Sequence, residues 1–116
     1  MLDLARRAVA CAAWKWRSGM LAWEPEDEHG GRGGHRVTAP GAPMVGWLPG
    51  FDDDATLGCF LALVLEAHGT DPARDPWECG EHPDGGGFVT LGDRTWTGTG
   101  LAAALVAALE AAPDAG

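Results

Sequence analysis

The sequence predicts an α+β domain in which about three helices pack on a small antiparallel sheet of short strands. Apolar residues recur at helical spacing in three segments, near the start, in the middle and at the end of the chain. Between them lie short stretches of strand-like residues bounded by Gly and Pro. The short links favour antiparallel pairing, because a parallel crossover needs about a dozen residues or more. The predicted order is α-β-β-β-α-β-β-β-α within a single domain, residues 1–116.

The first helix is expected over residues 2–13, where Leu4, Ala8 and Cys11 fall on one stripe. Directly after it, Trp14 and Trp16 alternate with basic residues, which is the period of a strand. Further short strand segments are expected at residues 20–23, 36–38 and 44–48.

An acidic, Gly-rich segment at residues 24–35 interrupts these strands. It combines several carboxylates with several glycines and contains no apolar run. We expect it to be an exposed, flexible loop.

The middle helix is expected from Ala55 to His68 and should be the central core element. Asp residues at 52–54 can cap its first turn, and Gly69 stands at the usual C-terminal stop. Its predicted apolar face consists of Leu57, Phe60, Leu61, Val64 and Leu65.

The last third of the chain predicts three strands followed by a helix. Strand-like segments occur at residues 77–79, 87–91 and 95–97, with a tight turn at Gly92-Asp93. The final helix is expected over residues 101–112, with Thr99 as its N-cap.

The charge balance favours a protein partner. The chain has 8 Lys and Arg against 17 Asp and Glu, a net charge of -9. This charge repels nucleic-acid phosphates and anionic lipids, so direct nucleic-acid binding and membrane association are not expected. A protein partner with a basic surface fits better, although a merely solubilising coat is the alternative. No segment has the length or cleavage pattern of a membrane span or export signal, so a cytoplasmic location is expected.

The sequence lacks a recognisable catalytic, metal or cofactor pattern, and we expect neither enzyme activity nor a cofactor. Ser18 is the only serine, Lys15 is the only lysine, and there is no tyrosine. Cys79 and His82 have the spacing of one zinc-ligand pair, but a second pair is missing. The same two residues leave open a small thiol-dependent hydrolase. The three cysteines are expected to be reduced.

Tryptophan is unusually frequent, and alternation along the strands cannot place all six rings inside. An exposed Trp beside charged residues is a typical anchor of a protein interface. The predicted partner-binding residues are Trp14, Trp16, Glu24, Glu26, Asp27, Glu28 and Trp77. A second acidic set surrounds Trp77 and consists of Asp71, Asp75, Glu78 and Glu81.

Three stretches carry a resemblance: residues 4–11 with Trp14, Trp16 and Gly19-Met20; Leu48-Pro49 leading into residues 55–64; and residues 105–113. Together they resemble small uncharacterised proteins of tailed bacteriophages and prophages. The resemblance implies a setting, the host cytoplasm, but no mechanism. It leads to the hypothesis of a non-enzymatic accessory protein that binds a host protein, and to the narrower hypothesis that it inhibits a nucleic-acid-targeting defence complex in an anti-CRISPR-like manner. A virion or assembly component is a further alternative, and the oligomeric state is left open.

Overall fold

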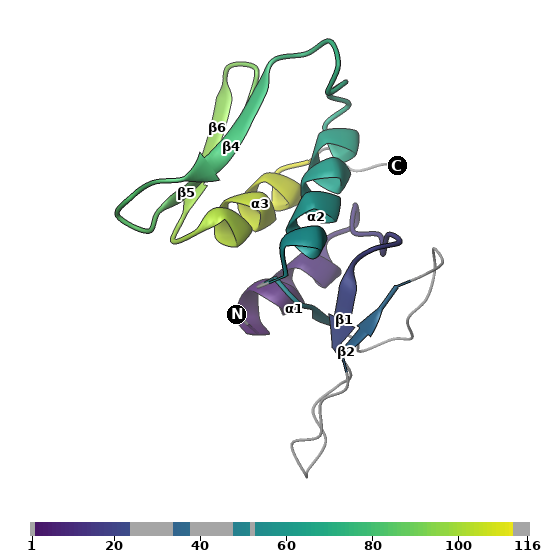
Figure 1. Ribbon diagram of the computed structural model, residues 1–116. Coiled ribbons are helices and arrows are strands. Elements are labelled where there is room, and N and C mark those ends of the chain that lie inside the picture. Colours follow the sequence, from purple (N-terminus) through teal and green to yellow (C-terminus); the bar gives the residue numbers. More distant parts are fainter. Residues whose placement is uncertain (1, 24–33, 38–47, 52, 113–116) are drawn as a thin grey trace.

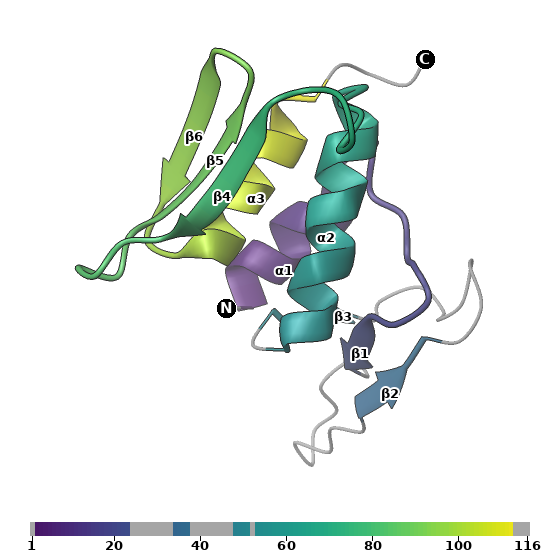
Figure 2. The ribbon, with the colours of Figure 1, turned by 45° about the horizontal axis from the view of Figure 1, so that its top comes forward.

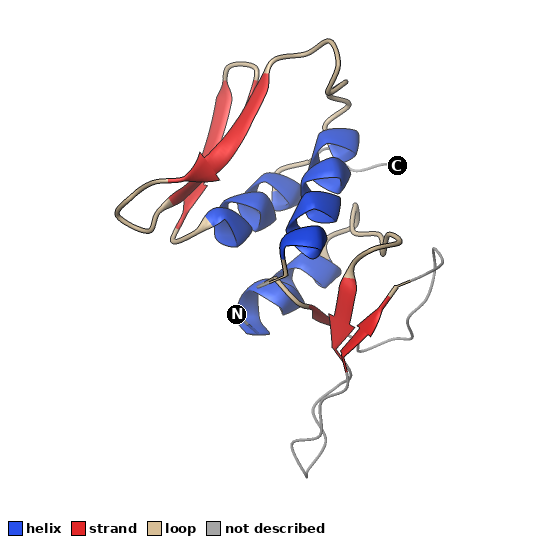
Figure 3. Cartoon of the chain, in the orientation of Figure 1, coloured by secondary structure: helices blue, strands red, loops and turns tan. Residues whose placement is uncertain are grey.

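Three helices and six short strands alternate along the described part of the chain, in the predicted α+β order (Figures 1 and 3). The computed structural model describes residues 2–23, 34–37, 48–51 and 53–112. The elements are α1 (Leu2–Ala10), β1 (Leu21–Trp23), β2 (Gly34–Arg36), β3 (Leu48–Pro49), α2 (Asp54–Ala67), β4 (Trp77–Glu81), β5 (Gly87–Leu91), β6 (Arg94–Gly98) and α3 (Leu101–Glu110).

The strands form two antiparallel sheets, where the sequence predicted one. The first has the order β2-β1-β3 and the second the order β4-β5-β6. In the first sheet Leu21 pairs with Arg36 and Trp23 with Leu48. In the second, two hairpins place β5 in the centre. The two groups of strands are separated in sequence by α2, and each group pairs locally.

Two predicted segments, the acidic loop and the strand expected at 44–48, lie largely outside the described residues. Of the acidic loop at 24–35, residues 24–33 are not described, while Gly34 and His35 belong to β2. Of the strand expected at 44–48, only Leu48 is described, and it pairs in β3.

The predicted strand at Trp14–Arg17 has no regular structure, and α1 ends at Ala10, before the predicted residue 13.

The start of α2 is tied to the first sheet through Asp53, its N-cap. The Asp53 carboxylate accepts hydrogen bonds from the Thr56 backbone N–H at 2.9 Å and from the Thr56 hydroxyl at 2.8 Å. It also accepts two from the Arg36 guanidinium of β2, at 2.6 and 3.2 Å. The Thr56 hydroxyl oxygen in turn accepts from the Leu21 N–H of β1 at 2.7 Å. One carboxylate therefore joins α2 to two strands. Just beyond the C-terminal end of α2, Gly69 takes the left-handed conformation with φ of 69°.

The buried face of α2 is rotated from the predicted one. Leu57 and Leu61 are only partly buried, whereas Thr56 and Leu63 lie inside with Phe60, Val64 and Leu65. Phe60 sets this orientation, because its ring stacks on Phe51 at 5.0 Å and meets Trp14 edge-to-face at 5.5 Å.

The central element is α3 rather than the middle helix. It contacts α1, α2 and all three strands of the second sheet, and Figure 2 shows it between that sheet and the other two helices. Small side chains explain this position, because alanines let neighbours approach from several sides. Its buried residues are Ala102, Ala104, Leu105, Val106, Ala108 and Leu109.

Glycines permit the close contact between α3 and the second sheet. A Cβ atom on Gly98 would lie 2.5 Å from the Ala103 Cβ, and one on Gly87 would overlap the backbone of Gly100. The N-cap of α3 is Gly100, not the predicted Thr99, and it makes no side-chain cap bond. The sheet and the helix N-terminus therefore touch backbone to backbone.

One hydrophobic core unites both sheets and the three helices. Its buried residues include Ala8 of α1, Ala22 of β1, Phe60 of α2, Val89 of β5 and Leu105 of α3. No helix among the described residues is long and apolar enough to span a membrane.

Candidate functional site

Trp14 and Trp16, two of the predicted partner-binding residues, both pack against the core. Their rings meet edge-to-face at 5.3 Å, and both are partly buried. The Nε1 of Trp14 is buried and has no hydrogen-bond partner among the described residues. These contacts account for both rings as part of the core, and their role in partner binding stays a prediction.

The basic residues between these tryptophans are engaged with α2. The Glu66 carboxylate binds the Arg17 guanidinium at 2.9 Å and the Lys15 ammonium at 3.5 Å. The basic residues that alternate with the tryptophans are therefore paired with an acid of the same molecule. The predicted acidic residues Glu24, Glu26, Asp27 and Glu28 lie outside the described residues.

Cys79 and His82, the candidate thiol–imidazole pair, are placed on opposite faces of the second sheet. Cys79 pairs with buried Val89 and packs against the core on the α3 side. His82, an odd number of residues further along, stacks on Phe88 at 5.0 Å, on the other face. The sheet therefore does not bring the imidazole to the thiol.

The Cys79 thiol is also held in its protonated form. Burial, and to a smaller extent the neighbouring Glu78 charge, raises the pKa of Cys79. A nucleophilic cysteine needs the opposite shift, because the thiolate is the reactive species.

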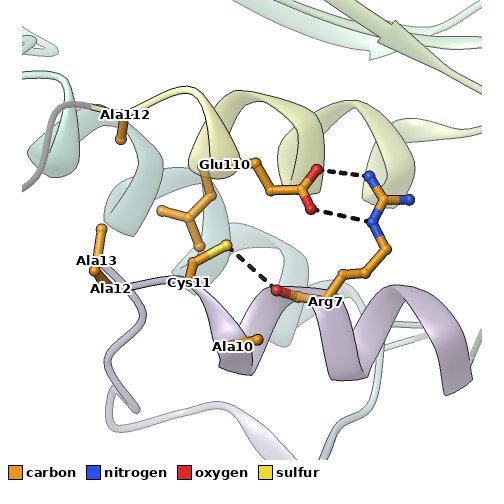
Figure 4. Close-up of a pocket in the computed structure, with 8 residues that line it drawn as sticks. Arg7, Ala10, Cys11, Ala12, Ala13, Glu110 and Ala112 are labelled. Atoms are coloured by element: carbon orange, nitrogen blue, oxygen red, sulfur yellow. Dashed lines mark hydrogen bonds and ion pairs between the residues drawn. The ribbon is translucent and has the colours of Figure 1, made fainter.

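A pocket of about 310 Å³ lies between the C-terminal ends of α1 and α3 (Figure 4). Its charged groups neutralise each other, because the Arg7 guanidinium donates two hydrogen bonds to the Glu110 carboxylate at 3.1 and 2.6 Å. The Cys11 thiol donates to the Arg7 carbonyl at 3.3 Å, and burial raises the pKa of Cys11. Alanine side chains form most of the remaining wall. The groups that line the pocket thus offer neither a free charge nor an activated nucleophile.

Trp77, the third predicted anchor, is exposed at the start of β4. The residue is 39% exposed, and among the described residues it is the one large hydrophobic residue that is exposed. Its indole Nε1 donates to the Pro72 carbonyl at 3.2 Å, which fixes the ring over the preceding turn. A ring that is both exposed and oriented is suited to an interface, since little freedom is lost on binding.

Four carboxylates lie close to Trp77 along the sequence. Residues 71–78 are all exposed, and Glu81 at the end of β4 is exposed as well. We call this region the β4 surface, and it consists of Asp71, Asp75, Trp77, Glu78 and Glu81. None of its four carboxylates makes an ion pair with another described residue. Arg74 is exposed between Asp71 and Asp75, so the four carboxylates leave this stretch with a net negative charge that is available to a partner.

The turn before β4 holds two of these carboxylates in place. The Asp71 carboxylate accepts from the Ala73 N–H at 2.9 Å, and the Asp75 carboxylate accepts from the Asp71 N–H at 2.8 Å. Hydrogen bonds to backbone leave both groups charged and oriented. The sequence pointed to these acids through their proximity to Trp77, but it predicted β4 only to residue 79 and so missed that Glu81 belongs to the same strand.

No protein-family model, curated protein or solved structure matches this chain. The resemblance to phage proteins stays a prediction. Within the described segments, no three His, Cys, Asp or Glu side chains are grouped to hold a metal ion.

Proposed function

We propose that this chain is a non-enzymatic protein-binding domain. It uses the β4 surface to bind a partner protein that is basic at the contact. The observation that carries the proposal is an exposed, oriented Trp77 in an exposed segment whose four carboxylates make no ion pair with a described residue. An aromatic anchor supplies buried area in the complex, and the carboxylates steer a cationic partner toward it. The phage setting and inhibition of a host defence complex enter the proposal only through the sequence resemblance, and the cytoplasmic location enters only through the sequence pattern. Binding itself does not depend on them.

The opposite placement of Cys79 and His82 counts against the thiol-hydrolase alternative. The raised pKa of Cys79 points the same way, because it keeps the thiol protonated near neutral pH. Partner binding requires no activated group, and exposed residues such as those of the β4 surface are sufficient for it.

A random-peptide display selection on the immobilised full chain tests the proposal. We expect the enriched peptides to be rich in Lys and Arg and to carry at least one apolar residue for Trp77. Trp77→Ala should weaken their binding by more than about tenfold, the range of an interface anchor, since its truncation costs about 2 kcal/mol or more. Isothermal titration with the enriched peptides measures this loss.

Two variants with neutralised acids make the test specific to the β4 surface. Glu78→Gln/Glu81→Gln should lose affinity, whereas Asp3→Asn/Asp54→Asn removes the same charge from exposed positions in the first turns of α1 and α2. The second pair should bind nearly as well as the unmodified chain. Enriched peptides without a basic bias, or equal losses in the two variants, would refute the proposal.

A further inference from the structure

The outer edge of β4 is an unpaired strand edge. In the order β4-β5-β6, β4 has a partner on one side only, and no described strand pairs with its other side. α3 lies mainly beneath β5 and β6. Main-chain groups at such an edge are a template for another strand.

Hydrogen bonds at both ends of the β4–β5 ladder identify the groups that face outward. The Gly92 N–H donates to the Pro76 carbonyl at 3.0 Å, and the His82 N–H donates to the Gly86 carbonyl at 2.6 Å. Because bonded and non-bonded pairs alternate in an antiparallel ladder, Glu78 and Gly80 bond to β5. The N–H and C=O groups of Trp77, Cys79 and Glu81 therefore point away from the sheet.

We propose that an extended, basic segment of the partner protein adds to this edge as a fourth strand of the second sheet. The inference rests on the proposed function and adds the mode of binding: backbone hydrogen bonds supply affinity, and side chains along β4 supply selectivity. A second copy of this chain is a poor occupant, because β4 against β4 would bring the carboxylates of two copies together. The β6 edge lacks these carboxylates, and its Arg94 is stacked over Trp96 at 4.7 Å.

The side-chain alternation of β4 predicts the sequence that would bind. Trp77 and Glu81 lie on the face that carries Val89, whereas Glu78 lies on the opposite face. Directly opposed residues on neighbouring strands share a face. In an antiparallel addition the ligand therefore has a basic residue opposite Glu81, a second basic residue opposite Glu78, and an apolar residue opposite Trp77. This gives the pattern basic-x-x-basic-apolar, and a parallel addition reverses it.

Proline substitution tests the edge without disturbing the existing ladder. Cys79→Pro removes an outward N–H, a position where an edge strand tolerates proline. It should weaken binding of a selected basic peptide about fivefold, the usual worth of one such hydrogen bond. Cys79→Val keeps the N–H and controls for the lost thiol, while Thr97→Pro removes an outward N–H from β6. Both controls should bind like the unmodified chain. Equal affinity of Cys79→Pro and Cys79→Val, or an equal loss in Thr97→Pro, would contradict strand addition.

Amide hydrogen exchange on the unmodified chain gives a readout that needs no variant to fold. The outward amides of Trp77, Cys79 and Glu81 should exchange fast in the free protein and become protected when the peptide binds, while those of Glu78 and Gly80 are protected throughout. A basic peptide that binds and depends on the β4 carboxylates, yet leaves the three outward amides unprotected, would overturn strand addition and leave the proposed function standing. Selection that yields no basic peptide would overturn both.

Discussion

At the scale of single residues, Asp53 has the clearest structural role. Hydrogen bonds from Arg36 first and from Thr56 second lower the pKa of Asp53 from 3.8 to about 2. The Oδ2 atom of this carboxylate both caps α2 and accepts from Arg36 of β2, so the charge of Asp53 and its position both contribute to the fold.

The depressed pKa of Asp53 predicts a defined loss of stability in acid. Because the folded-state pKa lies below the unfolded value of 3.8, the contribution of the charge is fully present above pH 3.8 and is lost as the pH falls through about 2. Asp53→Ala should lower the free energy of unfolding by about 1 to 2 kcal/mol at neutral pH, as for a lost N-cap. Urea unfolding from pH 7 to pH 2 should show the difference from the unmodified chain shrinking below pH 3.8.

A second variant, Arg36→Gln, completes this measurement. It removes the first cause of the pKa shift and leaves the cap in place. The acid-dependent part of the difference should be smaller in this background. A difference between Asp53→Ala and the unmodified chain that is independent of pH would mean that the ion pair with Arg36 contributes nothing to folding.

At the scale of elements, the periodicity of the sequence predicted the three helices and their order, because helical spacing is a local property. It could not predict how α2 is turned, since that depends on Phe51 and Trp14 packing on Phe60 from distant segments. The central place of α3 was missed for a similar reason: it depends on Gly87 and Gly98 letting a helix touch the sheet. Of the candidate site, the sequence indicated Trp77 and its acids, but strand pairing alone defines the open edge of β4.

The rotation of α2 predicts unequal costs for two leucines that lie within one turn on roughly opposite sides of the helix. Leu63 is 1% exposed, whereas Leu61 is only partly buried. Leu63→Ala should therefore lower the free energy of unfolding by about 2 to 5 kcal/mol, the usual cost of truncating a buried leucine. Leu61→Ala removes the same atoms and should cost clearly less. Chemical denaturation of both variants would contradict the observed packing if Leu61→Ala proved the more damaging of the two.

At the scale of the whole molecule, the acidic residues differ in whether a basic residue of the same chain is paired with them. Basic residues in the first part of the chain are paired with acids of the helices, as in Arg7 with Glu110 and Arg17 with Glu66. The carboxylates of the β4 surface have no such partner among the described residues. The β4 surface therefore contributes unpaired negative charge that can attract a basic partner at long range.

The association rate of a selected basic peptide, measured by stopped-flow against ionic strength, tests this claim most directly. The screening length falls from about 30 Å at 0.01 M to about 8 Å at 0.15 M salt, so steering by the β4 carboxylates should slow association on the order of tenfold over this range, with dissociation changing much less. The variant Asp71→Asn/Asp75→Asn/Glu78→Gln/Glu81→Gln should associate slowly at every salt concentration while keeping its melting temperature. An association rate equal to that of the unmodified chain, with no dependence on salt in either protein, would contradict the account.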